Sequence, residues 1–151
     1  MTAPALALSL RFACRFSDPA AQATLTRRRI ARWIRAALLA PAEIGVRFVD
    51  ADEGLQLNRD YRGQDHATNV LTFGYATAPN VAADLVLCVP VLEREAAQAG
   101  IGIEAHCAHL LVHGTLHAQG YDHEADAPAR EMEARESALL RSLGYADPYA
   151  R

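Results

Sequence analysis

The spacing of apolar side chains along these 151 residues changes near Pro90. Before that residue, stretches with an apolar residue at every second position alternate with stretches of helical spacing, and beyond it the spacing is helical throughout. A period of two indicates a strand with one buried face, and a period near 3.6 indicates an amphipathic helix. The pattern therefore predicts an α+β fold, in which one sheet is covered by helices.

Four strands and five helices are predicted. The strands cover residues 6–16, 44–48, 69–75 and 84–89, and the helices cover 25–40, 50–61, 91–99, 103–118 and 127–143. Pro41 ends the first helix, and Gly100 and Gly120 fall where two later helices should end, since glycine adopts the left-handed conformation at little cost. We expect a single domain over residues 1–151: a mixed four-stranded sheet, helices packed on it, and a metal site among the C-terminal helices.

Composition places the chain among ordinary globular proteins, because 51% of the residues are apolar and 22% are charged. Residues 1–10 are apolar but short and lack a basic start, so we expect neither a signal peptide nor a membrane span, and a cytoplasmic location. Cys14, Cys88 and Cys107 are widely spaced and form no CxxC motif, which predicts free thiols rather than a disulfide.

The charge is unevenly distributed. Residues 1–42 contain a single acid, Asp18, and seven arginines: Arg11, Arg15, Arg27, Arg28, Arg29, Arg32 and Arg35. Such a cluster binds nucleic acid through phosphates in some proteins and is simply solvated in others, and the sequence leaves both interpretations open.

Three histidines have the spacing of a metal site. His113 and His117 are four residues apart and so share one face of a predicted helix, and Gly120 allows a turn that brings His123 back towards them. Three imidazoles leave a fourth tetrahedral position for water, as in catalytic zinc sites. We expect one Zn²⁺ per chain, although nickel, copper or cobalt also suits imidazole ligands.

The residue after His113 bears on the reaction. Metzincin proteases share the histidine spacing but have a glutamate general base at that position, where this chain has Gly114. A phosphodiester is a better candidate substrate, because a metal-bound water and neutralised phosphoryl oxygens meet its main chemical demands.

The other polar residues near this motif have less specific interpretations. His109 is interpreted as a packing residue or a group that orients a ligand, while His106 and His66 are interpreted as ordinary core or surface histidines. Asp122 either orients an imidazole, helps to activate water, or caps a helix.

Three segments resemble the YbeY endoribonucleases, a family of bacterial rRNA maturation factors. Residues 113–123, HGTLHAQGYDH, resemble the family signature HGxLHxxGYDH, and residues 58–73, NRDYRGQDHATNVLTF, resemble NxxYRxxDxxTNVLSF. Residues 84–88 resemble a third, shorter strand motif. Thr72 stands where the family usually has serine, and Ala83 where it usually has glycine.

The resemblance implies a metal-dependent endoribonuclease, specific for single strands, that matures the 3′ end of small-subunit rRNA and takes part in ribosome quality control. It implies that His113, His117 and His123 are the zinc ligands and that Arg62 is a catalytic arginine that binds phosphate oxygens. The implied partners are single-stranded RNA, the ribosome or its small subunit and a ribosomal protein, with no membrane. Two alternatives stay open: a metzincin-like metalloprotease, and a noncatalytic assembly factor stabilised by zinc.

Overall fold

The computed structural model describes residues 4–64, 66–121 and 126–150, and for Asp126 and Ala127 it describes the backbone alone. The strands are β1 (Leu6–Phe12), β2 (Ala42–Val49), β3 (Val70–Ala76) and β4 (Val81–Cys88). The helices are α1 (Pro19–Thr24), α2 (Arg27–Ala37), α3 (Ala51–Arg62), α4 (Val89–Ala99), α5 (Ile103–Ala118) and α6 (Asp126–Ser142).

The strands form one mixed sheet in the order β1-β2-β4-β3. β1 pairs with β2 and β2 with β4 in parallel, whereas β3 runs antiparallel to β4 at one edge. This arrangement confirms the predicted α+β class and the mixed four-stranded sheet.

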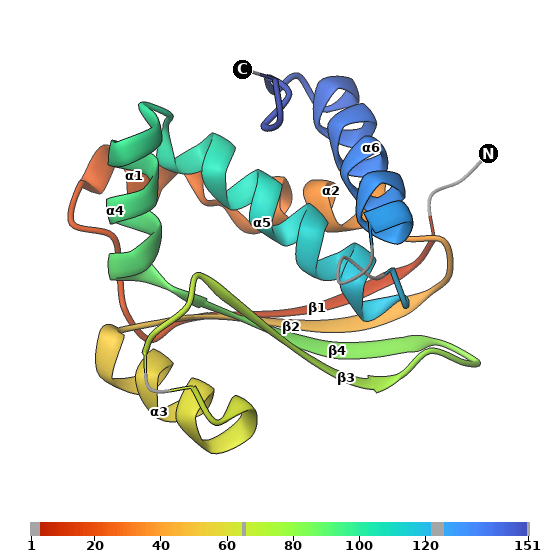
Figure 1. Ribbon diagram of the computed structural model, residues 1–151, viewed down its shortest axis with the longest axis horizontal. Helices are drawn as coiled ribbons and strands as arrows, with labels where there is room; N and C mark the ends of the chain where they lie inside the picture. The colour runs from red at the N-terminus through yellow and green to blue at the C-terminus, as the bar shows by residue number, and fades with distance from the viewer. Residues whose placement is uncertain (1–3, 65, 122–125, 151) are drawn as a thin grey trace.

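The helices cover the two faces of the sheet unequally. α1, α2, α4, α5 and α6 lie on one face, and α3 lies alone on the other (Figure 1). α5 packs against four of the other helices and two of the strands, and most of its side chains are buried. A helix that is apolar on nearly all sides belongs inside a fold, so α5 is the axis around which the helical layer is built.

A smaller apolar cluster fixes α3 to the opposite face. Its fully buried members come from the ends of β2, β3 and β4 and from the start of α4: Val49, Leu71, Val86, Cys88 and Val91. Leu57 of α3 packs on this cluster. Gly54 allows the approach, because a Cβ there would lie 3.1 Å from the Cys88 sulfur.

The first predicted strand is too long. β1 ends at Phe12 rather than at residue 16, because the backbone amides of Ala13 and Cys14 both donate to the Phe48 carbonyl and the chain leaves the sheet there. Phe16 is buried even though it lies outside the strand, which is why it continues the apolar pattern.

The prediction also missed a short helix and placed several boundaries wrongly, including the end of the helix predicted over residues 25–40, which the structure ends at Ala37, four residues before Pro41. α1 begins at Pro19 because the Asp18 side chain accepts a hydrogen bond from the Ala20 amide, and Leu25 caps its end instead of starting the next helix. β4 begins at Val81, three residues earlier than predicted, where its amide donates to the Pro41 carbonyl.

The cysteines are spread over the fold. All three thiols are free, with Cys88 and Cys107 buried and Cys14 half-buried. Burial raises the pKa of the Cys88 and Cys107 thiols, so both are poor nucleophiles at neutral pH. Within residues 4–64, 66–121 and 126–150, no helix has both the length and the apolar character needed to cross a bilayer.

Candidate active site

A polar pocket of about 350 Å³ lies where the end of α3, the segment leading into β3, and α5 come together. The first two parts follow one another in the chain, whereas α5 lies about 40 residues further on, and the packing of α5 on the sheet brings it to them. The pocket is lined by Asn58, Arg62, Gln64, His66, Thr68, Asn69, Val70, Leu71, Thr72, His113 and His117.

α5 contributes the two histidines. They lie one turn apart, their ring centroids are 6.4 Å apart, and their ring planes differ by only 8°. Gly114 brings this part of α5 close to the sheet, because a Cβ there would lie 3.1 Å from a Leu85 methyl and 3.5 Å from the Thr72 hydroxyl. Both imidazoles are half-buried and line the pocket.

The two imidazoles are oriented in the same way, since each uses its Nδ1 atom to bond to the protein. Nδ1 of His117 lies 3.1 Å from the Tyr121 carbonyl oxygen, and Nδ1 of His113 bonds to the Glu136 carboxylate. Both partners are acceptors, so Nδ1 carries the proton in each neutral ring and Nε2 carries the lone pair. Metal-binding histidines commonly have this arrangement.

Glu136 reaches His113 from α6, and its side chain has no exposed area. Burial alone would raise the pKa of this carboxyl, but hydrogen bonds with His109, His113 and Tyr149 outweigh it and lower the pKa to about 2. The residue is therefore a buried carboxylate that is charged at neutral pH.

Arg62 is the last residue of α3 and is exposed at the pocket. Gly63 follows it in the left-handed conformation, with φ of 67°, and ends the helix. Asn58 donates a 2.7 Å hydrogen bond to the His66 carbonyl, which ties the following loop back to α3. The loop is thereby held beside the guanidinium.

The structure brings together three of the four predicted site residues: Arg62, His113 and His117. His123 and Asp122 lie outside the described residues. Within the part of the chain that the structure describes, no group of three or more His, Cys, Asp or Glu side chains is arranged to hold a metal ion. The set of three histidine ligands therefore stays a prediction. The structure places two of the three, His113 and His117, side by side.

The remaining histidines have different positions. His66 lines the pocket, although its sequence context gave it no special standing. His106 is buried and bonds to Glu95 at 2.9 Å, as expected for a core histidine. His109 lies next to His113 and bonds to Tyr149, in agreement with its interpretation as a packing or orienting residue.

Two residues of this region carried no recognisable signal in the sequence. Glu136 is one of several acids in its stretch of the chain, and Tyr149 lies beyond the last predicted helix. Only the packing of α6 on α5 shows that Glu136 is the carboxylate that meets His113.

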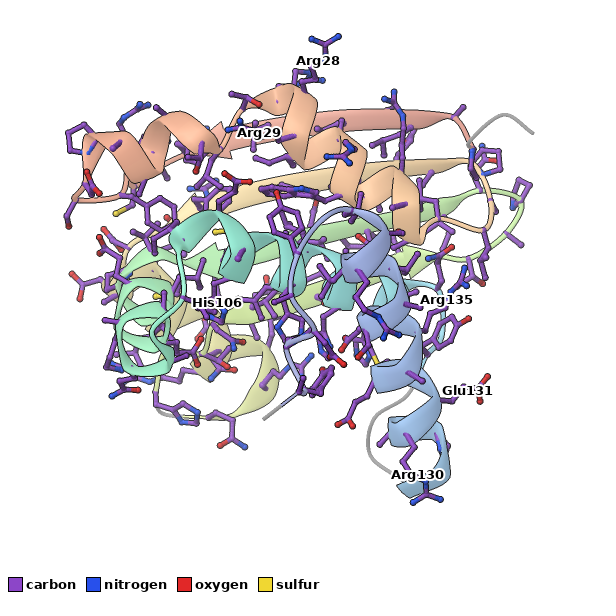
Figure 2. The ribbon with its side chains drawn as sticks, turned by 90° about the horizontal axis from the view of Figure 1, so that it is seen from above. Arg28, Arg29, His106, Arg130, Glu131 and Arg135 are labelled. Carbon is purple, nitrogen blue, oxygen red and sulfur yellow. The ribbon has the colours of Figure 1, made fainter. Side chains whose placement is uncertain are left out.

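The arginine cluster lies on a different part of the surface. Arg27, Arg29 and Arg32 of α2 donate to the backbone carbonyls of Leu8, Thr24 and Leu143, respectively. Arg28 projects away from the body of the fold (Figure 2). Three of the seven arginines of the cluster therefore bond to the protein's own backbone.

Comparison with known proteins agrees with the motifs that surround this pocket. The model of the family Endoribonuclease YbeY matches residues 16–144. A protein of that name from Methylibium petroleiphilum is 63% identical over 147 residues, covering 97% of this chain and 96% of the relative. The corresponding protein of Verminephrobacter eiseniae is 62% identical over 147 residues, with 97% and 95% of the two chains covered.

The fold is also found among solved structures. The solution structure of TM1509 from Thermotoga maritima superimposes with a TM-score of 0.57 and 21% identity, covering 95% of this chain and 99% of that one. At that identity the likeness concerns the fold alone. The family match and the relatives, which cover nearly the whole length of both chains, show that this chain belongs to the YbeY endoribonuclease family.

Proposed function

We propose that this chain is a metal-dependent endoribonuclease, specific for single-stranded RNA, that matures the 3′ end of small-subunit rRNA and acts in ribosome quality control. The observation that carries the proposal is the pocket in which Arg62, from the end of α3, faces the same space as His113 and His117 of α5. The matching family and the relatives are named as endoribonucleases, which supports this activity.

The donor set of the pocket fits a divalent ion. His113 and His117 would hold it through Nε2, with His123 as the third ligand, and zinc is the ion that we propose. Such an ion supplies Lewis acidity and acidifies water, which are the main requirements for hydrolysing a phosphodiester at neutral pH.

The role of Arg62 follows from its chemistry and its exposure. A guanidinium is always charged and presents a planar set of donors that matches two phosphate oxygens. Arg62 lines the pocket and is exposed, so its guanidinium keeps its charge without a large desolvation cost. Such a group can bind a substrate phosphate and stabilise the negative charge that develops on it.

The pocket argues against the protease alternative. In metzincins the residue after the first histidine is a glutamate, whereas here Gly114 packs against Leu85 and leaves little room for a side chain. A protease would therefore have to draw its general base from elsewhere in the chain.

The primary experiment is cleavage of a single-stranded RNA carrying the 3′ precursor sequence of small-subunit rRNA, alone and with small ribosomal subunits. We expect the wild type to cleave, a chelator to abolish cleavage, and added zinc to restore it. Circular dichroism of the chelated protein separates the enzyme from the assembly factor. An enzyme keeps its fold without the ion, whereas a protein held together by zinc unfolds.

His117→Ala should lose the ion and the cleavage activity together. The imidazole supplies one of three ligands, and two remaining histidines hold zinc much more weakly. Metal content after dialysis and the cleavage rate are the measurements. Retention of one zinc per chain by a well-folded His117→Ala protein contradicts the ligand assignment.

Arg62→Glu should keep the ion and lose cleavage, because the exposed guanidinium contacts substrate rather than metal. A charge reversal at the phosphate site is expected to lower kcat/KM by at least about a hundredfold, comparable to the loss of one transition-state donor. Arg59→Glu, one turn earlier on α3, is the matched charge control. A cleavage rate of Arg62→Glu equal to that of the wild type would rule out the assigned role.

A further inference from the structure

The segment that follows α6 returns to the layer formed by α5 and α6, which lie side by side in both views (Figures 1 and 2). Asp147 fixes its path. One carboxylate oxygen of Asp147 accepts a 2.7 Å hydrogen bond from the Ser137 hydroxyl and a 2.9 Å hydrogen bond from the Tyr149 amide. These contacts determine where the Tyr149 side chain begins.

The Tyr149 hydroxyl joins this segment to the histidines of α5. It donates to Oε2 of Glu136, and Nε2 of His109 lies 3.3 Å from the hydroxyl oxygen. The His109 ring also meets the tyrosine ring edge to face, with centroids 5.5 Å apart and planes at 85°. The phenol is therefore held by hydrogen bonds on its oxygen and by packing on its ring.

Glu136 links Tyr149 to His113. Its Oε2 accepts from the tyrosine and its Oε1 accepts from Nδ1 of His113. The carboxylate is fully buried, so it cannot meet a substrate and acts only through its neighbours.

On the basis of the proposed function, we infer that Glu136 and Tyr149 are positioning residues for His113, so that the segment 146–150 is part of the metal site. The carboxylate fixes the tautomer and the orientation of the His113 imidazole. It also makes Nε2 more basic and so a stronger electron-pair donor to a metal ion. The phenol holds the carboxylate in the rotamer that reaches His113. Loss of the phenol leaves a buried carboxylate oxygen short of a hydrogen bond, which favours its reorientation.

The test is metal affinity, measured with the full-length protein by chelator competition for Zn²⁺, and by the absorption spectrum of the Co²⁺-loaded form. We compare wild type, Glu136→Gln and Tyr149→Phe. Substitution of a residue that hydrogen-bonds to a metal ligand typically lowers metal affinity by about 10–100-fold. We therefore expect a loss of about 10–100-fold for Glu136→Gln and a loss near the lower end of that range for Tyr149→Phe, with an altered cobalt spectrum in both.

Tyr75→Phe is the matched control. Its hydroxyl also bonds to a carboxylate, at 2.7 Å from Asp84, but it lines a different hollow, which Leu57 and Tyr61 of α3 also line. Its metal affinity should equal that of the wild type. Thermal unfolding of each apo protein shows which variants fold. If Glu136→Gln does not fold, Tyr149→Phe still tests the inference.

Each outcome has a definite meaning. Wild-type affinity in both folded variants overturns the inference, and wild-type affinity in Tyr149→Phe alone removes Tyr149 and its segment from the metal site. A wild-type protein that binds zinc but cleaves no RNA contradicts the proposed function instead, because the comparison of affinities does not depend on RNA cleavage.

Discussion

Single side chains set how closely α5 approaches the sheet. A Cβ at Gly114 would lie 3.1 Å and 3.3 Å from the two methyl groups of Leu85, which is fully buried, so there is little room for a side chain there. Because Gly114 has no side chain, α5 can lie close to the sheet, and this brings the neighbouring His113 into the pocket.

Gly114→Ala should destabilise the protein by roughly 1 kcal/mol. Overpacking a tight core costs about 1–3 kcal/mol, and the better helix propensity of alanine returns up to about 1 kcal/mol. Urea denaturation measures the difference, and cleavage should slow as α5 moves away from Thr72. Gly74→Ala, at an exposed strand position with nothing within 4 Å of the added Cβ, should stay within about 0.5 kcal/mol of wild type. Equal stability of the two variants would show that the contact with Leu85 is not tight.

The sequence predicted the position of a site residue where its partner in the site lies close to it in the chain. His113 and His117 share a helix face by spacing alone, and the structure places both in the pocket. The partner of His113 could not be predicted in this way. Glu136 lies 23 residues further along the chain, and its identity depends on how α6 packs on α5.

Among the elements, α3 contributes to the proposed chemistry through Arg62, which lies on its last turn. The two ends of this helix are stabilised differently. At its start, Asp50 accepts a 2.8 Å hydrogen bond from the Glu53 amide, and at its end Gly63 adopts the left-handed conformation. Only the second end lies at the pocket.

Substitutions at the two ends of α3 should separate stability from activity. Asp50→Ala removes the N-cap and Gly63→Ala forces alanine into a left-handed conformation, and each change costs about 1 kcal/mol. We expect similar losses in the free energy of unfolding, but a clear loss of cleavage only for Gly63→Ala, because that change displaces Arg62. Denaturation and cleavage assays on both proteins provide the measurement. A larger loss of activity in Asp50→Ala would mean that the whole helix, rather than its end, positions the guanidinium.

Periodicity predicted the type of nearly every element but not all of the boundaries. Phe12 and Phe16 follow the same alternation, yet only the first is in the sheet, because the amides after it turn towards Phe48. α1 was missed for a related reason: six residues are too few to show a helical period, and its signal was the cap formed by Asp18 and Pro19.

At the scale of the whole molecule, one hydrogen bond joins the end of the helical layer to the start of α5. Tyr145, beyond α6, donates to Glu104 at 2.6 Å, and its ring packs edge to face against Trp33 at 6.0 Å. Burial, together with the hydrogen bond to Glu104, raises the pKa of Tyr145 to about 12, from 10.0 in a free side chain.

This raised pKa predicts a loss of stability in alkaline solution. The folded state holds the phenolic proton more tightly than the unfolded state, so the stabilisation is complete below about pH 10 and is lost as the pH rises through about 12. Denaturation at a series of pH values should show the free energy of unfolding falling more steeply in the wild type than in Tyr145→Phe. Parallel curves for the two proteins would show that Tyr145 does not titrate with folding.

The assembly of the pocket from two separated stretches of the chain has a consequence for the newly made protein. The walls of the pocket come from the end of α3, from the start of β3, and from α5. Because β3 is held in the sheet by β4, the pocket needs β4 and α5 in place as well as the segment that contains Arg62. Contacts between distant parts of a chain form late, since the intervening loops must close first. A growing polypeptide that exposes Arg62 and its loop therefore has no assembled pocket until α5 has been synthesised and has docked. The topology itself delays activity until translation has passed α5.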